Sequence, residues 1–211
     1  MKFKTIIFDL DGTIADTLPL CIAAFKKSVE PLLNSTLSDD EIIATFGPSE
    51  EGTIRKLVPL QEAAGVAAYL KNYEELHYTC PVPFDGIKDL LEALKTAGVK
   101  LGMVTGKGQH STVISLKQFE LAQYFEVMET GSSEGPNKVA GIRNILKRLN
   151  SNISESLYVG DAPSDIKYCK EVGIPIAAAA WASTTNGSEL EKLNPDQIFY
   201  SIADFKNWLM K

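Results

Sequence analysis

The sequence has little of what secreted, membrane-spanning or nucleic-acid-binding proteins need. Its three cysteines are odd in number and lack the spacing of metal ligands, which favours reduced thiols. The longest apolar run, 174–182, is about half as long as a membrane-spanning helix, and the N-terminus lacks a signal-peptide pattern. The net charge is −6 with no cluster of Lys and Arg, which argues against nucleic-acid partners. These absences predict a soluble cytoplasmic protein.

Nucleotide-binding loops are missing as well. The run from Gly106 to Gly108 lacks the third glycine of a dinucleotide fingerprint, and no glycine-rich loop ends in Gly-Lys-Ser/Thr. Hydrophobic residues make up 45% of the 211 residues and charged residues 23%, which is typical of a globular protein with a core. The length suits one large domain, or a core with a smaller partner.

Short β-rich runs alternate with amphipathic helical stretches. The predicted strands are 5–8, 100–104, 125–128, 157–159 and 174–178, with 198–200 as a candidate edge strand. Helical spacing is clearest in two sets of apolar residues: Ile87, Leu90, Leu91 and Leu94, then Val139, Ile142, Leu146 and Leu149. Asp85 is the candidate N-cap of the first helix and Gly98 its stop. This alternation predicts an α/β fold with a doubly wound, Rossmann-like parallel sheet.

One interval breaks the alternation. Residues 15–79 show only helical pattern, between Gly12 on one side and Pro81, Pro83 and Gly86 on the other. We therefore predict an α/β core domain of residues 1–14 and 82–211 with an inserted helical cap domain, 15–81. The cap would stand over the carboxyl edge of the sheet, where open α/β sheets bind ligands.

Chemically useful side chains follow the predicted strands. They are Asp9 and Asp11 after the first, Thr105, Gly106 and Lys107 after the second, Lys138 at the helix after the third, and Asp161 with Asp165 after the fourth. All of these positions fall at one edge of the sheet, so the side chains can converge although they are distant in sequence.

Such a group of carboxylates needs a compensating cation, because the charges repel one another. Mg²⁺ suits oxygen ligands and often bridges carboxylates and phosphate oxygens. An aspartate can also serve as a nucleophile toward phosphorus. Of Asp9 and Asp11, one can attack while the other protonates the leaving oxygen and later activates water. Thr105 and Lys138 would then hold the phosphoryl oxygens.

These residues resemble the four signature motifs of the haloacid dehalogenase-like hydrolase superfamily. The motifs are Asp9-Leu-Asp11-Gly-Thr, Thr105, Lys138 and Gly160-Asp161-x-x-x-Asp165, and the resemblance covers essentially the whole chain. The helical insert is similar to the cap of the phosphoglycolate phosphatase and β-phosphoglucomutase branch.

The resemblance implies a role for each motif residue. Asp9 would be the nucleophile and Asp11 the general acid and base. Phosphate would be bound by Thr105, Gly106 and Lys138. Mg²⁺ would be bound by Asp9, the backbone carbonyl of Asp11, and Asp161, with Asp165 in support. Two departures put the substrate in doubt: Gly106 stands where many relatives have Asn, and Val139 where many have Pro.

The leading hypothesis is a phosphatase that hydrolyses a small phosphate monoester, with phosphoglycolate as the family-level expectation. A sugar phosphomutase would use the same Asp9 phosphoenzyme, and the motifs do not separate the two. A dehalogenase would leave Asp11 without a role, and a phosphate-accepting receiver module would be shorter and lack the insert. The expected partner is a small phosphorylated metabolite, without nucleic acid or membrane, for a monomer or homodimer.

Some residues have simpler interpretations. Asp165 would equally suit an N-cap for a helix over 166–172. His77 and His110 are expected to pack or to lie at the surface. The segment around Glu50 and Arg55 is expected to be a turn followed by a solvated helix. The role of Lys107 stays open.

Overall fold

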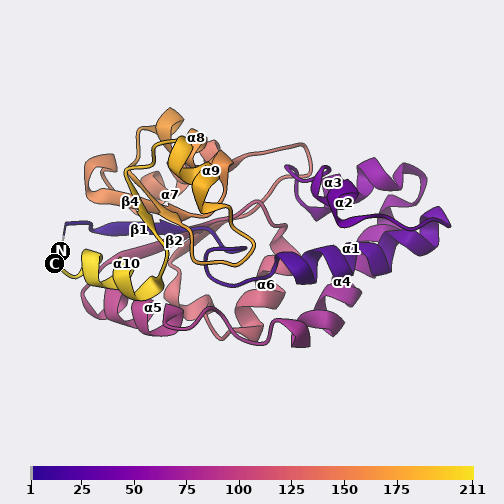
Figure 1. Cartoon of the computed structure of the whole chain (residues 1–211), viewed down its shortest axis with the longest axis horizontal. Helices are drawn as coiled ribbons and strands as arrows, with labels where there is room; N and C mark the ends of the chain where they lie inside the picture. The colour runs from indigo at the N-terminus through magenta and orange to yellow at the C-terminus, as the bar shows by residue number, and fades with distance from the viewer. Residues whose placement is uncertain (1) are drawn as a thin grey trace.

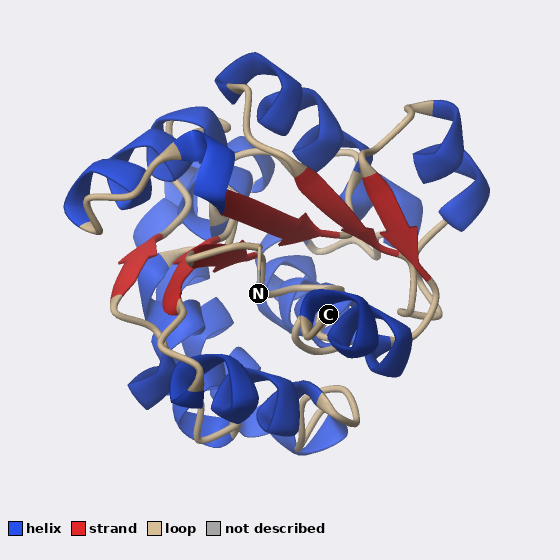
Figure 2. Ribbon diagram, turned by 90° about the vertical axis from the view of Figure 1, so that its left-hand side faces the viewer, coloured by secondary structure: helices blue, strands red, loops and turns tan. Residues whose placement is uncertain are grey.

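In the computed structural model, which describes residues 2–211, six parallel strands form one sheet in the order β3-β2-β1-β4-β5-β6. Phe8 of the central strand lies opposite Met103 on one side and Val159 on the other. Figure 2 shows the twisted sheet with helices around it. The strands are β1 Thr5–Phe8, β2 Lys100–Val104, β3 Val127–Glu129, β4 Ser156–Gly160, β5 Ile176–Ala179 and β6 Gln197–Phe199.

Alternate residues of the strands feed two hydrophobic cores, because successive side chains point to opposite faces of a sheet. Ile6 and Phe8 join the larger core, whereas Ile7 joins the other. The larger core is covered by α5 Ile87–Thr96, α6 Gln109–Gln118 and α10 Ile202–Leu209. The second is covered by α7 Lys138–Arg148, α8 Pro163–Val172 and α9 Gly187–Lys192. Helices on both faces confirm the predicted doubly wound sheet.

The segment between β1 and α5, all of which the structure describes, contains helices joined by loops, and no strand is found in it. It contains α1 Leu18–Leu33, α2 Asp39–Ile43, α3 Glu50–Leu57 and α4 Glu62–Leu76, with the 3₁₀ turns η1 Pro59–Gln61 and η2 His77–Thr79. The helices α1–α4 gather at the end of the molecule toward which β1 points (Figure 1). Two further 3₁₀ turns, η3 Ala122–Tyr124 and η4 Ile153–Glu155, lie in the rest of the chain. We refer to residues 15–81 as the insert; its exact domain boundaries stay a prediction.

The insert has its own aromatic packing. The rings of Phe25 in α1 and Tyr69 in α4 lie 4.5 Å apart, and the Asn72 amide donates a hydrogen bond to Ser28 Oγ at 2.9 Å. The two segments that connect the insert to the core lie side by side, since the Phe84 amide donates a hydrogen bond to the Ile14 carbonyl at 3.0 Å. No helix in the described range combines the length and apolarity needed to cross a membrane.

Some local predictions were wrong by a few residues. Asp85 is not the N-cap of α5: the helix begins at Ile87, and Gly86, at φ +83°, precedes it. The third strand begins at Val127 rather than Phe125, because Phe125 is the C-cap of the 3₁₀ turn Ala122–Tyr124 and its amide is bonded to Ala122. The fifth begins at Ile176, because the amide of Ile174 is still bonded to the end of α8. The predicted edge strand is confirmed as β6.

Candidate active site

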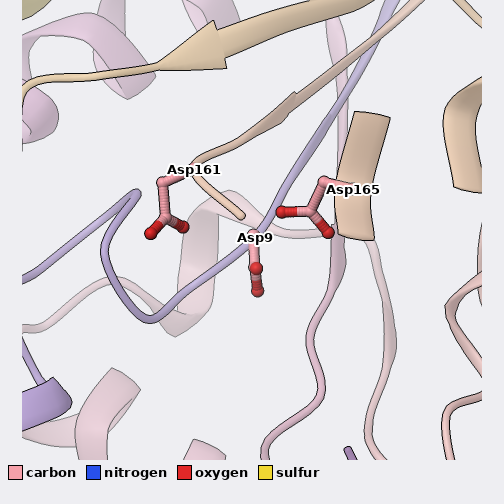
Figure 3. A group of neighbouring side chains, drawn as sticks. All are labelled: Asp9, Asp161 and Asp165. Atoms are coloured by element: carbon pink, nitrogen blue, oxygen red, sulfur yellow. The ribbon is translucent and has the colours of Figure 1, made fainter. Parts of the chain in front are cut away.

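Three aspartates meet where the strands end. Asp9 follows β1, Asp161 follows β4, and Asp165 lies in the first turn of α8; Figure 3 shows their carboxylates turned toward a common region. One oxygen from each lies within 4.8 Å of the other two. Asp9 and Asp161 border a cavity of about 300 Å³ between the strand ends and the insert, and Asp165 is buried beside it. The sequence prediction that Asp9, Asp161 and Asp165 converge therefore agrees with the geometry.

Asp9 lies at the floor of this cavity and is 5% exposed. Its Oδ1 accepts a hydrogen bond from the Leu10 amide at 2.7 Å, and its Oδ2 lies 2.5 Å from Lys138 Nζ. Burial raises the pKa of Asp9 to about 6, against the opposing effect of Lys138. The short bonds fix the orientation of the carboxylate toward the cavity.

Lys138 bridges Asp9 and Asp165. Lys138 begins α7, and its Nζ also lies 2.7 Å from Asp165 Oδ1. Asp165 is fully buried and accepts further bonds from Tyr158 Oη at 3.3 Å and the Ala162 amide at 3.2 Å. Burial alone would lower the pKa of Lys138, but Asp165 and Asp9 outweigh it and raise that pKa. Asp165 thus stands inside the first turn of α8 rather than at the N-cap position.

Asp161 approaches Asp9 from the other side. It accepts bonds from Thr13 Oγ1 at 3.0 Å and Thr185 Oγ1 at 3.3 Å. Burial, followed by the charges of Asp9 and Asp165, raises the pKa of Asp161 to about 8. A third carboxylate at this position is therefore electrostatically costly without a further cation.

The donor set fits a hard divalent cation. Every candidate ligand is a carboxylate oxygen, and three acids face one lysine. The raised pKa values of Asp9 and Asp161 express the excess of negative charge. Oxygen ligands of this kind suit Mg²⁺, and a cation would remove the electrostatic cost.

Asp11 also lines the cavity, but its side chain contacts residues other than this cluster. Its Oδ1 accepts a bond from Thr17 Oγ1 and lies 3.1 Å from Lys107 Nζ. Lys107, whose side chain is 1% exposed, also donates to Cys21 Sγ at 3.0 Å and lies over the ring of Tyr73. The lysine, which had no assigned role, therefore holds Asp11 against the insert.

The second strand end supplies neutral groups. Thr105 is 1% exposed, and its Oγ1 accepts a bond from the Lys107 amide at 3.1 Å. A hydroxyl that accepts one bond keeps its proton for an anion. Gly106 lines the cavity beside it. The carbonyl of Gly106 packs closely on Gly131: a Cβ added to Gly131 would lie 1.9 Å from the Gly106 oxygen.

The sequence profile of the haloacid dehalogenase-like hydrolases matches residues 6–179 of this chain. The protein belongs to that family. The pyrophosphatase PpaX of Bacillus pumilus is 30% identical to this hydrolase over 204 residues, 95% of this chain and 94% of the relative. A haloacid dehalogenase-like hydrolase from Streptococcus pneumoniae superposes with a TM-score of 0.79 at 25% identity, covering 99% of both chains. CbbY from Rhodobacter sphaeroides, at 18% identity, shares the fold with a TM-score of 0.80, covering 96% of both chains.

Family membership confirms the resemblance drawn from the motifs, and the protein is a phosphatase of the haloacid dehalogenase-like hydrolases. All of the motif residues border the cavity or contact a residue that does. The specific role of each motif residue stays a prediction.

Sequence reasoning was wrong about part of the hydrolase's insert. Glu50 was expected on a solvated helix but is 8% exposed. Its carboxylate accepts bonds from the Gly108 amide and Ser111 Oγ at the start of α6. Arg55, on the same helix, is exposed as expected and pairs with Glu62 and Glu134. No pattern around Glu50 indicates this contact, because its partners lie in another part of the sequence.

The two histidines lie outside the cavity. His77 is buried and packs between the rings of Tyr73 and Phe119. His110 is exposed near the start of α6. Neither residue lines the site, in agreement with the packing or surface roles expected for them.

Proposed function

We propose that this protein is a Mg²⁺-dependent phosphatase of small phosphate monoesters that forms a phosphoenzyme on Asp9. The observation that carries the proposal is the position of Asp9, which is held by Lys138 at the floor of the cavity with two more carboxylates beside it. We further expect a cytoplasmic enzyme whose partner is a small phosphorylated metabolite rather than nucleic acid or membrane.

Two carboxylates that line the cavity, Asp9 and Asp11, divide the chemistry. A carboxylate oxygen of Asp9 attacks phosphorus, and the bond between phosphorus and the alcohol oxygen breaks. Asp11 donates a proton to the departing alcohol. Water then attacks the phosphorus of the aspartyl phosphate, Asp11 accepts its proton, and phosphate leaves Asp9. The covalent intermediate separates one difficult displacement into two easier ones.

Neutral and cationic groups hold the phosphoryl oxygens. The Thr105 hydroxyl and the backbone at Gly106 border the phosphoryl position, and Lys138 supplies positive charge beside Asp9. Placement and charge stabilisation are the main requirements of phosphoryl transfer. Bound at Asp9, the Asp11 carbonyl and Asp161, Mg²⁺ would offset negative charge on the phosphoryl oxygens.

The test is turnover of an aryl phosphate by purified protein with Mg²⁺. Chelation should stop phosphate release, and added Mg²⁺ should restore it. Asp9→Asn should lower kcat by about 10⁴-fold or more, as loss of a covalent nucleophile does. Asp40→Asn, an exposed change in α2, serves as the control.

Mass spectrometry of protein quenched in acid during turnover should find phosphate on the peptide that contains Asp9. If Asp9→Asn keeps more than a few per cent of wild-type activity in uncontaminated protein, Asp9 is not the nucleophile. Full activity in excess chelator would contradict the metal requirement.

A further inference from the structure

The insert contributes an apolar wall to the active-site cavity. Asp9 and Lys138 line the same cavity, so a leaving alcohol bound beside them would lie near this wall. Five of its residues are apolar or aromatic: Leu18, Phe25, Phe46, Pro48 and Tyr69. Tyr69 is fully buried, and its neutral hydroxyl has no hydrogen-bond partner within residues 2–211.

The charges around this wall are already paired. Among the described residues that line the cavity, the only cations are Lys107 and Lys138. Lys138 contacts Asp9 and Asp165, whereas Lys107 lies 3.1 Å from Asp11 and 3.7 Å from Glu50. Neither lysine is left to meet a second anion on a substrate.

The charged residues of α3 make the wall still less suitable for an anion. Glu50 lines the cavity and adds a buried negative charge. Arg55, which follows Glu50 in the same helix, does not line the cavity and pairs with Glu62 and Glu134 at the surface. A carboxylate or phosphoryl group placed against this wall would lose its water beside Glu50 without gaining a cation.

We propose that this site selects phosphate monoesters whose alcohol is uncharged and mainly apolar, an inference that rests on the proposed function. Burial of an apolar group against Phe25 and Phe46 is favourable, because it removes apolar surface from water. The same wall disfavours substrates that carry a second anionic group, such as phosphoglycolate or pyrophosphate. This departs from the family-level expectation of phosphoglycolate.

The test compares esters that differ mainly in charge. In isobutyl phosphate, an isopropyl group replaces the planar carboxylate of phosphoglycolate at similar size. We expect kcat/KM for isobutyl phosphate to exceed that for phosphoglycolate and pyrophosphate by about tenfold or more. 2-Aminoethyl phosphate should also be a poorer substrate, because its ammonium would lose water at the wall while Glu50 already faces Lys107. A preference for any of the three charged compounds would overturn the inference.

A variant tests whether the wall itself makes the selection. Phe46 is 39% exposed at the cavity rim, so Phe46→Arg can add a cation without opening the core. It should lower KM for phosphoglycolate and reduce the preference for isobutyl phosphate by about tenfold. Leu60→Arg adds the same charge at a residue that is 98% exposed and outside the cavity, and should change neither.

The outcomes separate the two proposals. An unchanged preference in folded Phe46→Arg would show that this wall does not face the alcohol, and would overturn the inference alone. Turnover that depends on Asp9 but favours anionic esters would do the same and leave the proposed phosphatase intact. Absence of Asp9-dependent turnover with every ester would overturn both proposals.

Discussion

Gly12 carries two separate constraints at a single backbone position. Its φ of +73° lies in the left-handed region, which L-residues with a side chain seldom adopt. In addition, a Cβ at this position would lie 2.1 Å from Asp161 Oδ2. The turn after β1 can therefore approach the acid cluster only because residue 12 has no side chain.

Replacement of Gly12 by alanine should separate backbone strain from damage to the site. Gly98 provides a matched control, because its φ is +78° and a Cβ there would meet nothing within 4 Å. Both Gly12→Ala and Gly98→Ala should lose about 1–2 kcal/mol of unfolding free energy from the left-handed backbone. Only Gly12→Ala displaces Asp161, so only it should lose activity, by about a hundredfold. Denaturant unfolding and kcat/KM measure the two effects, and equal activity of the variants would contradict this role.

The site residues that could be predicted from the sequence are those that directly follow a strand. Asp9, Thr105 and Asp161 could be placed together from sequence, because parallel strands end at one edge of the sheet. Glu50 could not, since its contact with α6 depends on how the insert folds back onto the core. The Tyr158 hydroxyl donates a hydrogen bond to Asp165, but the sequence pattern predicts only that Tyr158 is a buried strand residue.

At the scale of elements, the type of each element was more predictable than its ends. Apolar periodicity fixes which residues of α5 are buried, and Ile87, Leu90, Leu91 and Leu94 are all at 0% exposure. Helix starts depend on local backbone conformations, and Gly86 replaces the expected cap at Asp85 through a positive φ. The strand order came from tertiary pairing, which no local pattern encodes.

The turn η2 joins the insert to α6 through a buried histidine. His77 Nε2 lies 3.1 Å from Ser115 Oγ, while Nδ1 has no partner among the described residues. Burial lowers the pKa of His77 below its ordinary value of 6.5, and the positive charge of Lys107 acts in the same direction. The folded protein therefore favours the neutral imidazole.

This burial predicts a pH dependence of stability. Below pH 6.5 the unfolded chain binds a proton at His77 more readily than the folded chain does, so the contribution of His77 to the unfolding free energy should fall as the pH falls. The raised pKa values of Asp9 and Asp161 act in the opposite direction, so the effect of His77 is measured as a difference between variants. His77→Gln, which keeps a hydrogen-bond donor for Ser115, should remove this contribution, so the variant should gain stability relative to the wild type as the pH falls. His110→Gln removes the only other histidine, at an exposed position, and should leave the slope unchanged. Urea unfolding between pH 5 and about 8 measures the slopes; equal slopes for the wild type and His77→Gln would contradict the prediction.

At the scale of the whole molecule, one core lysine contacts three helices of the insert. Lys107 meets Cys21 in α1, Glu50 in α3 and Tyr73 in α4, and it also faces Asp11. Burial raises the pKa of the Cys21 thiol to about 12, so this sulfur stays protonated and neutral. The position of Asp11 is thereby tied to the position of the insert.

Glu50 anchors the other side of this contact. Its carboxylate accepts bonds from the Gly108 amide and Ser111 Oγ, which places a negative charge at the N-terminal end of the ten-residue helix α6. Negative charge is favourable there, because the backbone amides of the first turn have no partners within the helix. The insert is therefore held over the cavity by a charge pair and a helix end together.

Glu50→Gln should loosen this closed arrangement while keeping the side chain's shape. The variant loses the charge that faces Lys107 and the helix end, which should cost about 1–3 kcal/mol of unfolding free energy. Hydrogen exchange should quicken at the amides of residues 108–112 and in α3, because the insert opens more often. Glu62→Gln removes an equivalent charge from an exposed pair with Arg55 and should leave exchange at these sites unchanged. If Glu50→Gln exchanges at the wild-type rate in both segments, Glu50 does not hold the insert, and closure must rest on the contact of Tyr73 and His77 with Ser115.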